Sequence, residues 1–136
     1  EPLRSMKDTA SGGEISRIAL AIEMVISNLL KRQTLIFDEI DVGISGRVAI
    51  QVAKKIGILS KSLQILCITH LPQTACIADK HYKIAKKVID RHTFAEADLL
   101  NESQHLNAIA LMISGTYDSA SALESAREME KSVKNG

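Results

Sequence analysis

A short, continuous apolar run at Thr34–Phe37 ends at two adjacent carboxylates, Asp38 and Glu39. Continuous apolar runs of this length are typical of strands buried inside a parallel sheet. A helical pattern follows over residues 47–59, with Val48, Val52, Ala53 and Ile56 expected to point inward. A second β-rich apolar run follows over residues 63–69. Strand, helix and strand within about 37 residues is the size of a right-handed βαβ crossover. The sequence therefore predicts an α/β fold with a parallel βαβ core and flanking helices.

Three polar side chains stand where the two predicted strands end. Asp38 and Glu39 end the first strand, and His70 ends the second. Because open α/β sheets bind ligands at the carboxyl ends of their strands, we expect the three to meet at one edge, here called the rim. There Asp38 would hold Mg²⁺ through water, Glu39 would polarise an attacking water, and the imidazole could bridge a γ-phosphate and that water. The alternative is a solvated loop with acids capping the next helix, and a histidine with only a structural role.

The segment Ser11–Glu14 opens a long helical pattern. Apolar residues recur at helical spacing over 15–30, which predicts a helix with one broad apolar face, ended by Lys31–Gln33. Ser11 and Glu14 have the spacing of a capping box. The two glycines between them would also let a phosphate approach the helix N-terminus closely, because no Cβ intervenes. Both interpretations can hold together.

The rest of the chain carries weaker patterns. We expect a lead-in loop before residue 11, a short helix at 72–78, an edge strand at 81–88, and helices at 103–113 and 119–129. Gly115 is the expected stop of the first of these last two helices, and Ser119 the expected cap of the second. No internal linker or repeat interrupts the 136 residues, so one domain is expected.

Composition narrows the class of protein further. Aromatic residues are only 3% of the chain, which argues against a stacking surface for single-stranded nucleic acid. The formal net charge is +1, so no overall basic field indicates DNA or membrane binding. Cys67 and Cys76 lack metal-type spacing and are expected to be reduced, buried thiols. One local basic stretch is interpreted as a solvated surface, with DNA contact as the alternative: Lys80, Lys83, Lys86, Lys87 and Arg91.

The same residues allow a rival chemistry. The three rim residues and Asp41 could form a metal cluster for hydrolysis, although that leaves Ser11–Glu14 without a purpose. Asp41 on its own is typical of an Asx turn. A phosphate loop of the form Gly-x-x-x-x-Gly-Lys-Ser/Thr is not found, because the nearest string, at 57–62, lacks the second glycine and follows a helix instead of a strand.

In combination these motifs resemble the C-terminal half of an ABC-type ATPase head, a P-loop NTPase-type fold. The order is a signature segment at 10–14, a Walker B run at 35–39, a D-loop at 40–45 and a switch histidine, His70. Three strings are similar to the RecN family of SMC-like bacterial DNA repair proteins: Ser-Gly-Gly-Glu-Ile-Ser-Arg, Phe-Asp-Glu-Ile-Asp-Val-Gly-Ile-Ser-Gly and Ile-Thr-His-Leu-Pro-Gln. Transporter ATPases usually have Pro after the Walker B glutamate, where this chain has Ile40. The resemblance covers nearly the whole chain and is weakest between residues 88 and 104.

The resemblance implies a split ATPase head. An N-terminal segment of the same protein would carry the phosphate loop. This chain, residues 1–136, would be the C-terminal lobe without the N-terminal lobe. The ligands would be ATP and Mg²⁺, with Asp38 as the metal-binding residue and Glu39 and His70 as catalytic residues. The chain alone is expected to be inactive, and its start at Glu1 to reflect an excised piece or a processed product.

The resemblance also implies two heads closing around two ATP molecules. Ser11, Gly12, Gly13 and Glu14 would meet the ATP bound on a second head, and Asp41 would lie across the dimer interface. The family acts in recombinational repair of DNA double-strand breaks. DNA is therefore an expected partner, no membrane is involved, and the expected location is the cytoplasm, at the nucleoid.

Two alternative functions stay open. The chain could be a non-catalytic dimerisation or partner module that keeps the fold, or the head of another SMC-like chromosome-maintenance ATPase. Glu39 favours an enzyme, because a degenerate module has no need of a carboxylate aimed at water.

Overall fold

The computed structural model describes residues 10–26, 34–89, 92–115 and 120–134 of the chain. Its helices are α2 (Gly12–Ile26), α3 (Gly46–Leu59), α4 (Pro72–Ala75), α5 (Glu102–Ser114) and α6 (Ala120–Lys134). Its strands are β1 (Thr34–Phe37), β2 (Gln64–Cys67), β3 (Tyr82–Ile89) and β4 (His92–Leu99). Four predictions fall outside the described residues: the lead-in loop over 1–9, the helix end over 27–33, the place of Arg91 and the cap at Ser119.

β1 and β2 form a parallel pair joined by the α3 crossover, which confirms the predicted α/β core. The register pairs Thr34 with Gln64 and Phe37 with Cys67, so the two strands end at the same edge. The backbone N–H of Ile68 also donates to the carbonyl of Phe37 (3.0 Å). β1 keeps its predicted bounds. β2 is shorter than the predicted run over 63–69, because its partner has only four residues to pair with.

The main core lies between this sheet, α2 and α3. It contains seven buried side chains: Leu20, Phe37, Ile40, Val52, Ile56, Leu59 and Leu63. The buried stripe of α3 repeats at three and four residues from Ala49 to Leu59. Val48 was predicted to point inward and is exposed instead. The prediction is wrong because a stripe that continues to Leu59 includes Ala49 and leaves Val48 at its edge.

The opposite face of the β1–β2 pair is apolar and uncovered within the described part of the chain. Ile36 is 70%, Leu66 47% and Ile68 62% exposed, and these three residues are here called the uncovered sheet face. Strands of parallel sheets are usually buried on both faces. The prediction of fully buried strands is therefore right for one face only.

α2 has an uncovered apolar face as well. Its buried positions are Gly13, Leu20 and Glu23, which lie toward the sheet and α3. Four large apolar side chains on the rest of its surface are exposed: Ile15, Ile18, Ile22 and Val25. The predicted broad apolar face is thus present in the helix, but little of it packs on the described part of this chain.

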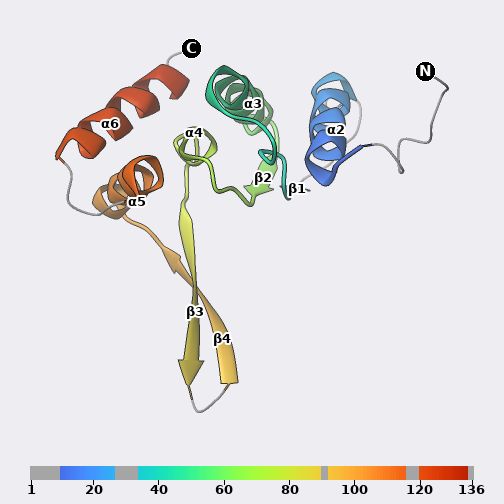
Figure 1. Cartoon of the computed structure of the whole chain (residues 1–136). Coiled ribbons are helices and arrows are strands. Elements are labelled where there is room, and N and C mark those ends of the chain that lie inside the picture. The colour runs from blue at the N-terminus through green and yellow to red at the C-terminus, as the bar shows by residue number, and fades with distance from the viewer. Residues whose placement is uncertain (1–9, 27–33, 90–91, 116–119, 135–136) are drawn as a thin grey trace.

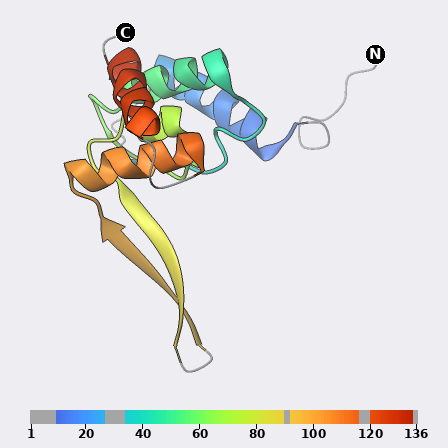
Figure 2. The same ribbon diagram turned by 60° about the vertical axis from the view of Figure 1, so that its left-hand side comes forward.

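β3 and β4 form a long antiparallel hairpin that extends away from the helices (Figures 1 and 2). The register pairs Tyr82 with Leu99 at its base and Ile89 with His92 near its tip. β3 agrees with the predicted edge strand. β4 was not predicted, because its Ala, Glu and Asp residues have low strand propensity and only the pairing with β3 orders them as a strand.

α5 and α6 pack on each other and on α4 around a second core of mostly small side chains: Ala75, Cys76, Ile109, Ala110, Ala122 and Ala126. α5 begins at Glu102, one residue before the predicted start, and is preceded by Asn101, which forms a capping box with Gln104. It ends as predicted at Gly115, whose φ of 73° is the left-handed conformation that glycine favours. Among the described helices, none is both long and apolar enough to cross a membrane.

Candidate functional site

Asp38 and Glu39 lie at the end of β1, where the chain turns sharply. Both residues are exposed, whereas the next residue, Ile40, is fully buried. Glu39 has a φ of 56°, a left-handed conformation that is uncommon for a residue other than glycine. The N–H of Val42 donates to the carbonyl of Glu39 (3.1 Å) and closes the turn. The turn allows two successive residues to be exposed at the rim, whereas residues of a strand would alternate between faces.

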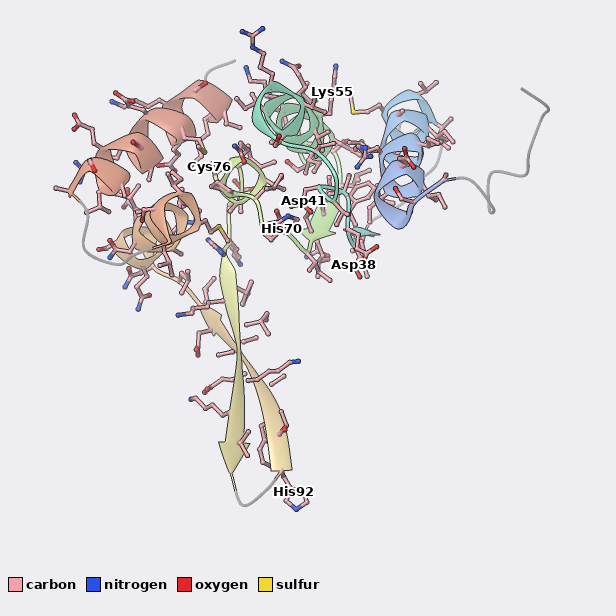
Figure 3. All side chains as sticks on the ribbon, in the orientation of Figure 1. Asp38, Asp41, Lys55, His70, Cys76 and His92 are labelled. Atoms are coloured by element: carbon pink, nitrogen blue, oxygen red, sulfur yellow. The ribbon has the colours of Figure 1, made fainter. Side chains whose placement is uncertain are left out.

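His70 follows β2 at the same edge, with its side chain 66% exposed. Figure 3 shows Asp38, Asp41 and His70 at the same end of the β1–β2 pair. The structure therefore places the three predicted rim residues at one edge of the sheet. No hydrogen bond or ion pair joins His70 to Asp38 or Glu39 in the part of the chain that the structure describes, so their chemical roles stay predictions.

The N-terminus of α2 is capped as the sequence predicted. The backbone N–H and the hydroxyl of Ser11 donate to Glu14 Oε2 (2.8 and 3.0 Å), and the N–H of Glu14 donates to Ser11 Oγ (3.4 Å). The hydrogen bond from the Ser11 backbone, and then that from its hydroxyl, lower the pKa of the Glu14 carboxyl. Glu14 is thus engaged in capping its own helix.

Gly12 and Gly13 bring the start of α2 directly against the turn after β1. A Cβ on Gly12 would lie 2.6 Å from Glu39 Oε2. A Cβ on Gly13 would lie 2.8 Å from the carbonyl oxygen of Glu39 and 2.9 Å from that of Val42. The glycines therefore allow a close contact between the start of α2 and Glu39 within one chain. The predicted contact of the two glycines with ATP on a second head would be made between two chains, and it stays a prediction.

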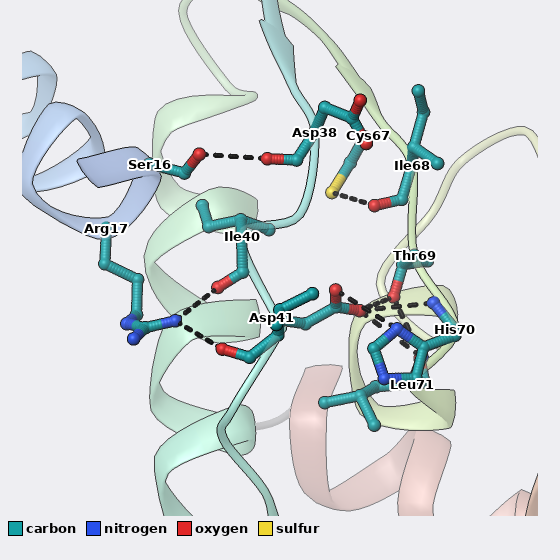
Figure 4. A network of polar contacts seen from close by, with 11 residues as sticks. Ser16, Arg17, Asp38, Ile40, Asp41, Cys67, Ile68, Thr69, His70 and Leu71 are labelled. Carbon is teal, nitrogen blue, oxygen red and sulfur yellow. Dashed lines mark hydrogen bonds and ion pairs between the residues drawn. The ribbon is translucent and has the colours of Figure 1, made fainter. Parts of the chain in front are cut away.

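Ser16 and Arg17, one helical turn further along α2, hold the same turn in place. Ser16 Oγ donates to the carbonyl of Asp38 (2.9 Å). Arg17 Nη1 donates to the carbonyl of Ile40 (3.2 Å), as Figure 4 shows, and to the carbonyl of Val42 (2.9 Å). Sequence reasoning gave neither side chain a role. The available signal was their position four residues after the two glycines, which puts them on the same side of the helix.

Asp41 lies beneath the rim, with its side chain only 1% exposed. Its Oδ2 accepts hydrogen bonds from the backbone N–H groups of His70 (3.2 Å) and Leu71 (3.3 Å) and from the hydroxyl of Thr69 (Figure 4). Its Oδ1 lies 3.5 Å from His70 Nδ1. The prediction that Asp41 lies across a dimer interface is not tested by a single chain. Within the chain, the carboxylate joins the loop after β1 to the loop after β2.

Among the described residues, the rim has neither a thiol with a lowered pKa nor a cluster of three or more metal-binding side chains. Burial, and after it the charges of Asp41 and Asp38, raise the pKa of the Cys67 thiol to about 12, so the thiol stays protonated. Cys67 is only partly buried, whereas Cys76 is fully buried, and both are free. The described residues contain no group of three or more His, Cys, Asp or Glu side chains placed to hold a metal ion. The alternative of a four-residue metal cluster is therefore not formed in this structure.

Comparison with known proteins points to one family of DNA repair proteins. The chain is 43% identical to the DNA repair protein RecN of Bacillus subtilis over 131 residues, which is 96% of this chain and 23% of that protein. It is 43% identical to RecN of Halalkalibacterium halodurans over 129 residues, with 95% and 23% covered. RecN of Deinococcus radiodurans is also 43% identical, over 95% of the chain and 22% of the relative. The chain thus spans less than a quarter of the length of these relatives.

A solved structure from work on the ATP-driven dimerization and DNA-stimulated activation of SMC ATPases has a similar fold. Its TM-score is 0.52 at 24% sequence identity, with 76% of this chain and 62% of that chain covered. No family model matches the chain. The chain is therefore homologous, along nearly its whole length, to a segment of the RecN DNA repair proteins, and its fold is that of an SMC-type ATPase head.

Proposed function

We propose that this chain is the C-terminal part of an ATP-hydrolysing head, in a RecN-like protein that acts in recombinational repair of DNA double-strand breaks. One observation carries the proposal. Asp38, Glu39 and His70 lie at the same edge of a parallel sheet, and the capped N-terminus of α2 lies directly against Glu39. Carboxylates and an imidazole at this edge, beside a helix N-terminus, suit the binding and hydrolysis of a nucleoside triphosphate.

The side chains divide the work at the rim. The Asp38 carboxylate is exposed and makes no hydrogen bond or ion pair among the described residues, which fits a residue that holds Mg²⁺ through water. A bound Mg²⁺ would neutralise charge on the phosphates. Glu39, on the strained turn, orients the attacking water toward the γ-phosphate. His70 contacts the γ-phosphate from the neighbouring loop.

The phosphate loop comes from another polypeptide segment, the N-terminal head segment of the same protein. Three features of this chain support such a partner: the uncovered sheet face, the uncovered apolar face of α2, and an open groove beside β2. The groove runs between β2 and the base of the hairpin, and its lining includes Ile65, Cys67, Tyr82, Ile84 and Leu99. In the described residues β2 pairs with β1 only, so its other edge is free to accept a strand.

The experiment that tests the proposal is Glu39→Gln in a head assembled from this chain and its N-terminal segment. We expect ATP to bind normally and turnover to slow at least a hundredfold, equivalent to about 3 kcal/mol of barrier. Glu128→Gln, which makes the same chemical change at an exposed site on α6, serves as the control and should turn over like the parent. Turnover near the parental rate in Glu39→Gln would show that Glu39 does not position water.

Pairing of two heads is tested by Ser11→Arg. If Ser11, Gly12, Gly13 and Glu14 meet ATP on a second head, an arginine at position 11 should leave ATP binding to one head intact and block ATP-dependent dimerisation in sedimentation experiments. Ser11→Ala is the matched control, because it also removes the capping hydroxyl but adds no bulk. Unchanged dimerisation of the arginine variant would remove this part of the proposal. In this proposal, DNA binding and the location at the nucleoid are properties of the whole protein.

A further inference from the structure

Asp41 has a buried carboxylate to which the proposed mechanism of hydrolysis assigns no role. A charged group costs free energy to bury unless hydrogen bonds or opposite charges compensate it. Asp41 is only 1% exposed, yet it lies three residues after the exposed Asp38. The donors that surround it explain why it is stable there.

Those donors come from one short segment, the loop after β2. The hydroxyl of Thr69 and the N–H groups of His70 and Leu71 all point to a single oxygen, Oδ2. Thr69 Oγ1 itself accepts from the N–H of Leu71 (3.0 Å). The backbone on both sides of the His70 Cα is therefore fixed by one carboxylate oxygen, which limits where the imidazole can lie.

The second oxygen, Oδ1, faces the ring of His70. The distance from Oδ1 to Nδ1 is 3.5 Å, long for a hydrogen bond, but bonds of this kind often tighten only when substrate binds. A carboxylate can only accept, so a ring nitrogen beside it has to carry the proton. The other ring nitrogen, Nε2, has no hydrogen-bond or ion-pair partner among the described residues, and the side chain is 66% exposed.

Asp41 is itself held from the opposite side. Arg17 binds the carbonyls of the two residues that flank it, Ile40 and Val42, and Ile40 is fully buried in the main core. A continuous series of contacts thus runs from α2 through the loop after β1 to the imidazole. The carboxylate has little freedom to move away from the ring.

We propose that Asp41 is a positioning residue for His70: it fixes the proton of the neutral ring on Nδ1 and presents Nε2 at the rim. The inference that this matters for hydrolysis rests on the proposed function. A phosphate oxygen is an acceptor, so contact with Nε2 requires a second ring proton. The resulting imidazolium would then lie between the Asp41 carboxylate and the phosphate, with a negative group on each side.

The decisive measurement is the position of the ring proton, which does not depend on catalysis. Long-range ¹H–¹⁵N spectra of the assembled head without nucleotide, at a pH where histidines are neutral, distinguish the two tautomers, and His70→Gln assigns the signal. We expect the proton on Nδ1 in the parent. In Asp41→Asn the amide oxygen can still accept from the loop, and the amide NH2 then faces Nδ1 as a donor. Because Nδ1 has to accept that hydrogen bond, we expect the proton on Nε2. Thr69→Val removes one donor to Oδ2, leaves Oδ1 facing the ring, and should keep the proton on Nδ1.

A parental ring with its proton on Nε2, or a proton that stays in place in Asp41→Asn, would overturn the inference. The kinetic part is separate. Asp41→Asn should lower kcat for ATP on the order of tenfold to a hundredfold, the cost of a misplaced catalytic group, with little change in KM. If the substitution moves the proton while kcat is unchanged, Asp41 still positions the ring, and it is the proposed part of His70 in hydrolysis that fails.

Discussion

At the scale of single residues, the two glycines that start α2 meet different neighbours and should respond differently to substitution. A Cβ at Gly13 would press on two backbone carbonyls, of Glu39 and Val42, at 2.8 and 2.9 Å. A Cβ at Gly12 would press only on the end of the flexible Glu39 side chain. We expect Gly13→Ala to destabilise the fold by about 1–3 kcal/mol, the usual effect of overpacking. Gly12→Ala should have a small effect, because the Glu39 side chain can move aside.

Urea unfolding of the two variants in the assembled head measures this difference, since a change in midpoint with the same slope reports stability. The pair controls for helix propensity, because both substitutions replace a glycine by alanine in the same helical turn. Equal midpoints for the two variants would contradict the close contact between α2 and the turn after β1. Gly12→Ala should have a second effect. Because it displaces the Glu39 carboxylate, it should slow ATP turnover even though the stability of the fold changes little.

The contrast between Asp38 and Asp41 shows how far sequence alone could predict the site. Asp38, Glu39 and His70 could be placed because they follow the two predicted strands, and the ends of parallel strands share an edge. The network around Asp41 could not, because its contact with Thr69 joins residues 28 positions apart, and that from Arg17 to Val42 joins residues 25 apart. Contacts of this kind depend on how the loops pack, which no local pattern specifies.

At the scale of helices and strands, local pattern predicted an element where it agreed with the packing. β1 and the α3 crossover have strong apolar patterns and lie where the sequence indicated. β4 has no such pattern, since along it Glu96 and Asp98 alternate with alanines. Its strand conformation depends on cross-strand neighbours, such as Lys83 opposite Asp98, and on an ion pair between Lys87 and Glu96.

The base of the hairpin is joined to α5 by two histidines, which should make stability depend on pH. His81 Nδ1 and His105 Nδ1 lie 2.9 Å apart, with the rings nearly perpendicular. Burial lowers the pKa of both imidazoles. The charge of His105 lowers the pKa of His81 further. For His105, the charge of Glu130 raises the pKa and the charge of Lys134 lowers it, and the net shift is downward. Because the unfolded chain binds protons more readily, this contribution to stability is complete above about pH 6.5 and is lost as the pH falls below that value.

Thermal unfolding between pH 7.5 and pH 5, values chosen to bracket the ordinary histidine pKa of about 6.5, measures this dependence. His105→Gln should flatten the profile, because it removes one of the two groups that take up protons on unfolding. His92→Gln is the matched control, since His92 lies exposed near the hairpin tip, far from α5 (Figure 3). A His105→Gln profile as steep as that of the parent would show that the pair does not control stability in this range.

For the whole molecule, the described structure has two cores and a large apolar surface that neither of them covers. The first core joins the sheet to α2 and α3, and the second joins α4, α5 and α6. Outside both lie the uncovered sheet face and the uncovered face of α2. Exposed apolar patches of this kind are typical of interaction sites or of proteins that aggregate. We therefore expect the chain alone to self-associate, and to form a one-to-one complex with a higher melting temperature when its N-terminal head segment is added.

Substitutions on the uncovered sheet face distinguish specific binding of the N-terminal segment from nonspecific hydrophobic association. Ile36→Thr combined with Leu66→Thr puts a β-branched residue, which suits a strand, at both positions and removes apolar surface that is exposed in the described chain. We expect this variant to self-associate less in sedimentation experiments and to lose the complex with the N-terminal segment. Val88→Thr, at a site on the hairpin that is about as exposed as Ile36, should change neither property. A sharp, concentration-independent melting curve of a monomeric parent chain would contradict the expectation, because such a chain would need no partner to cover its sheet.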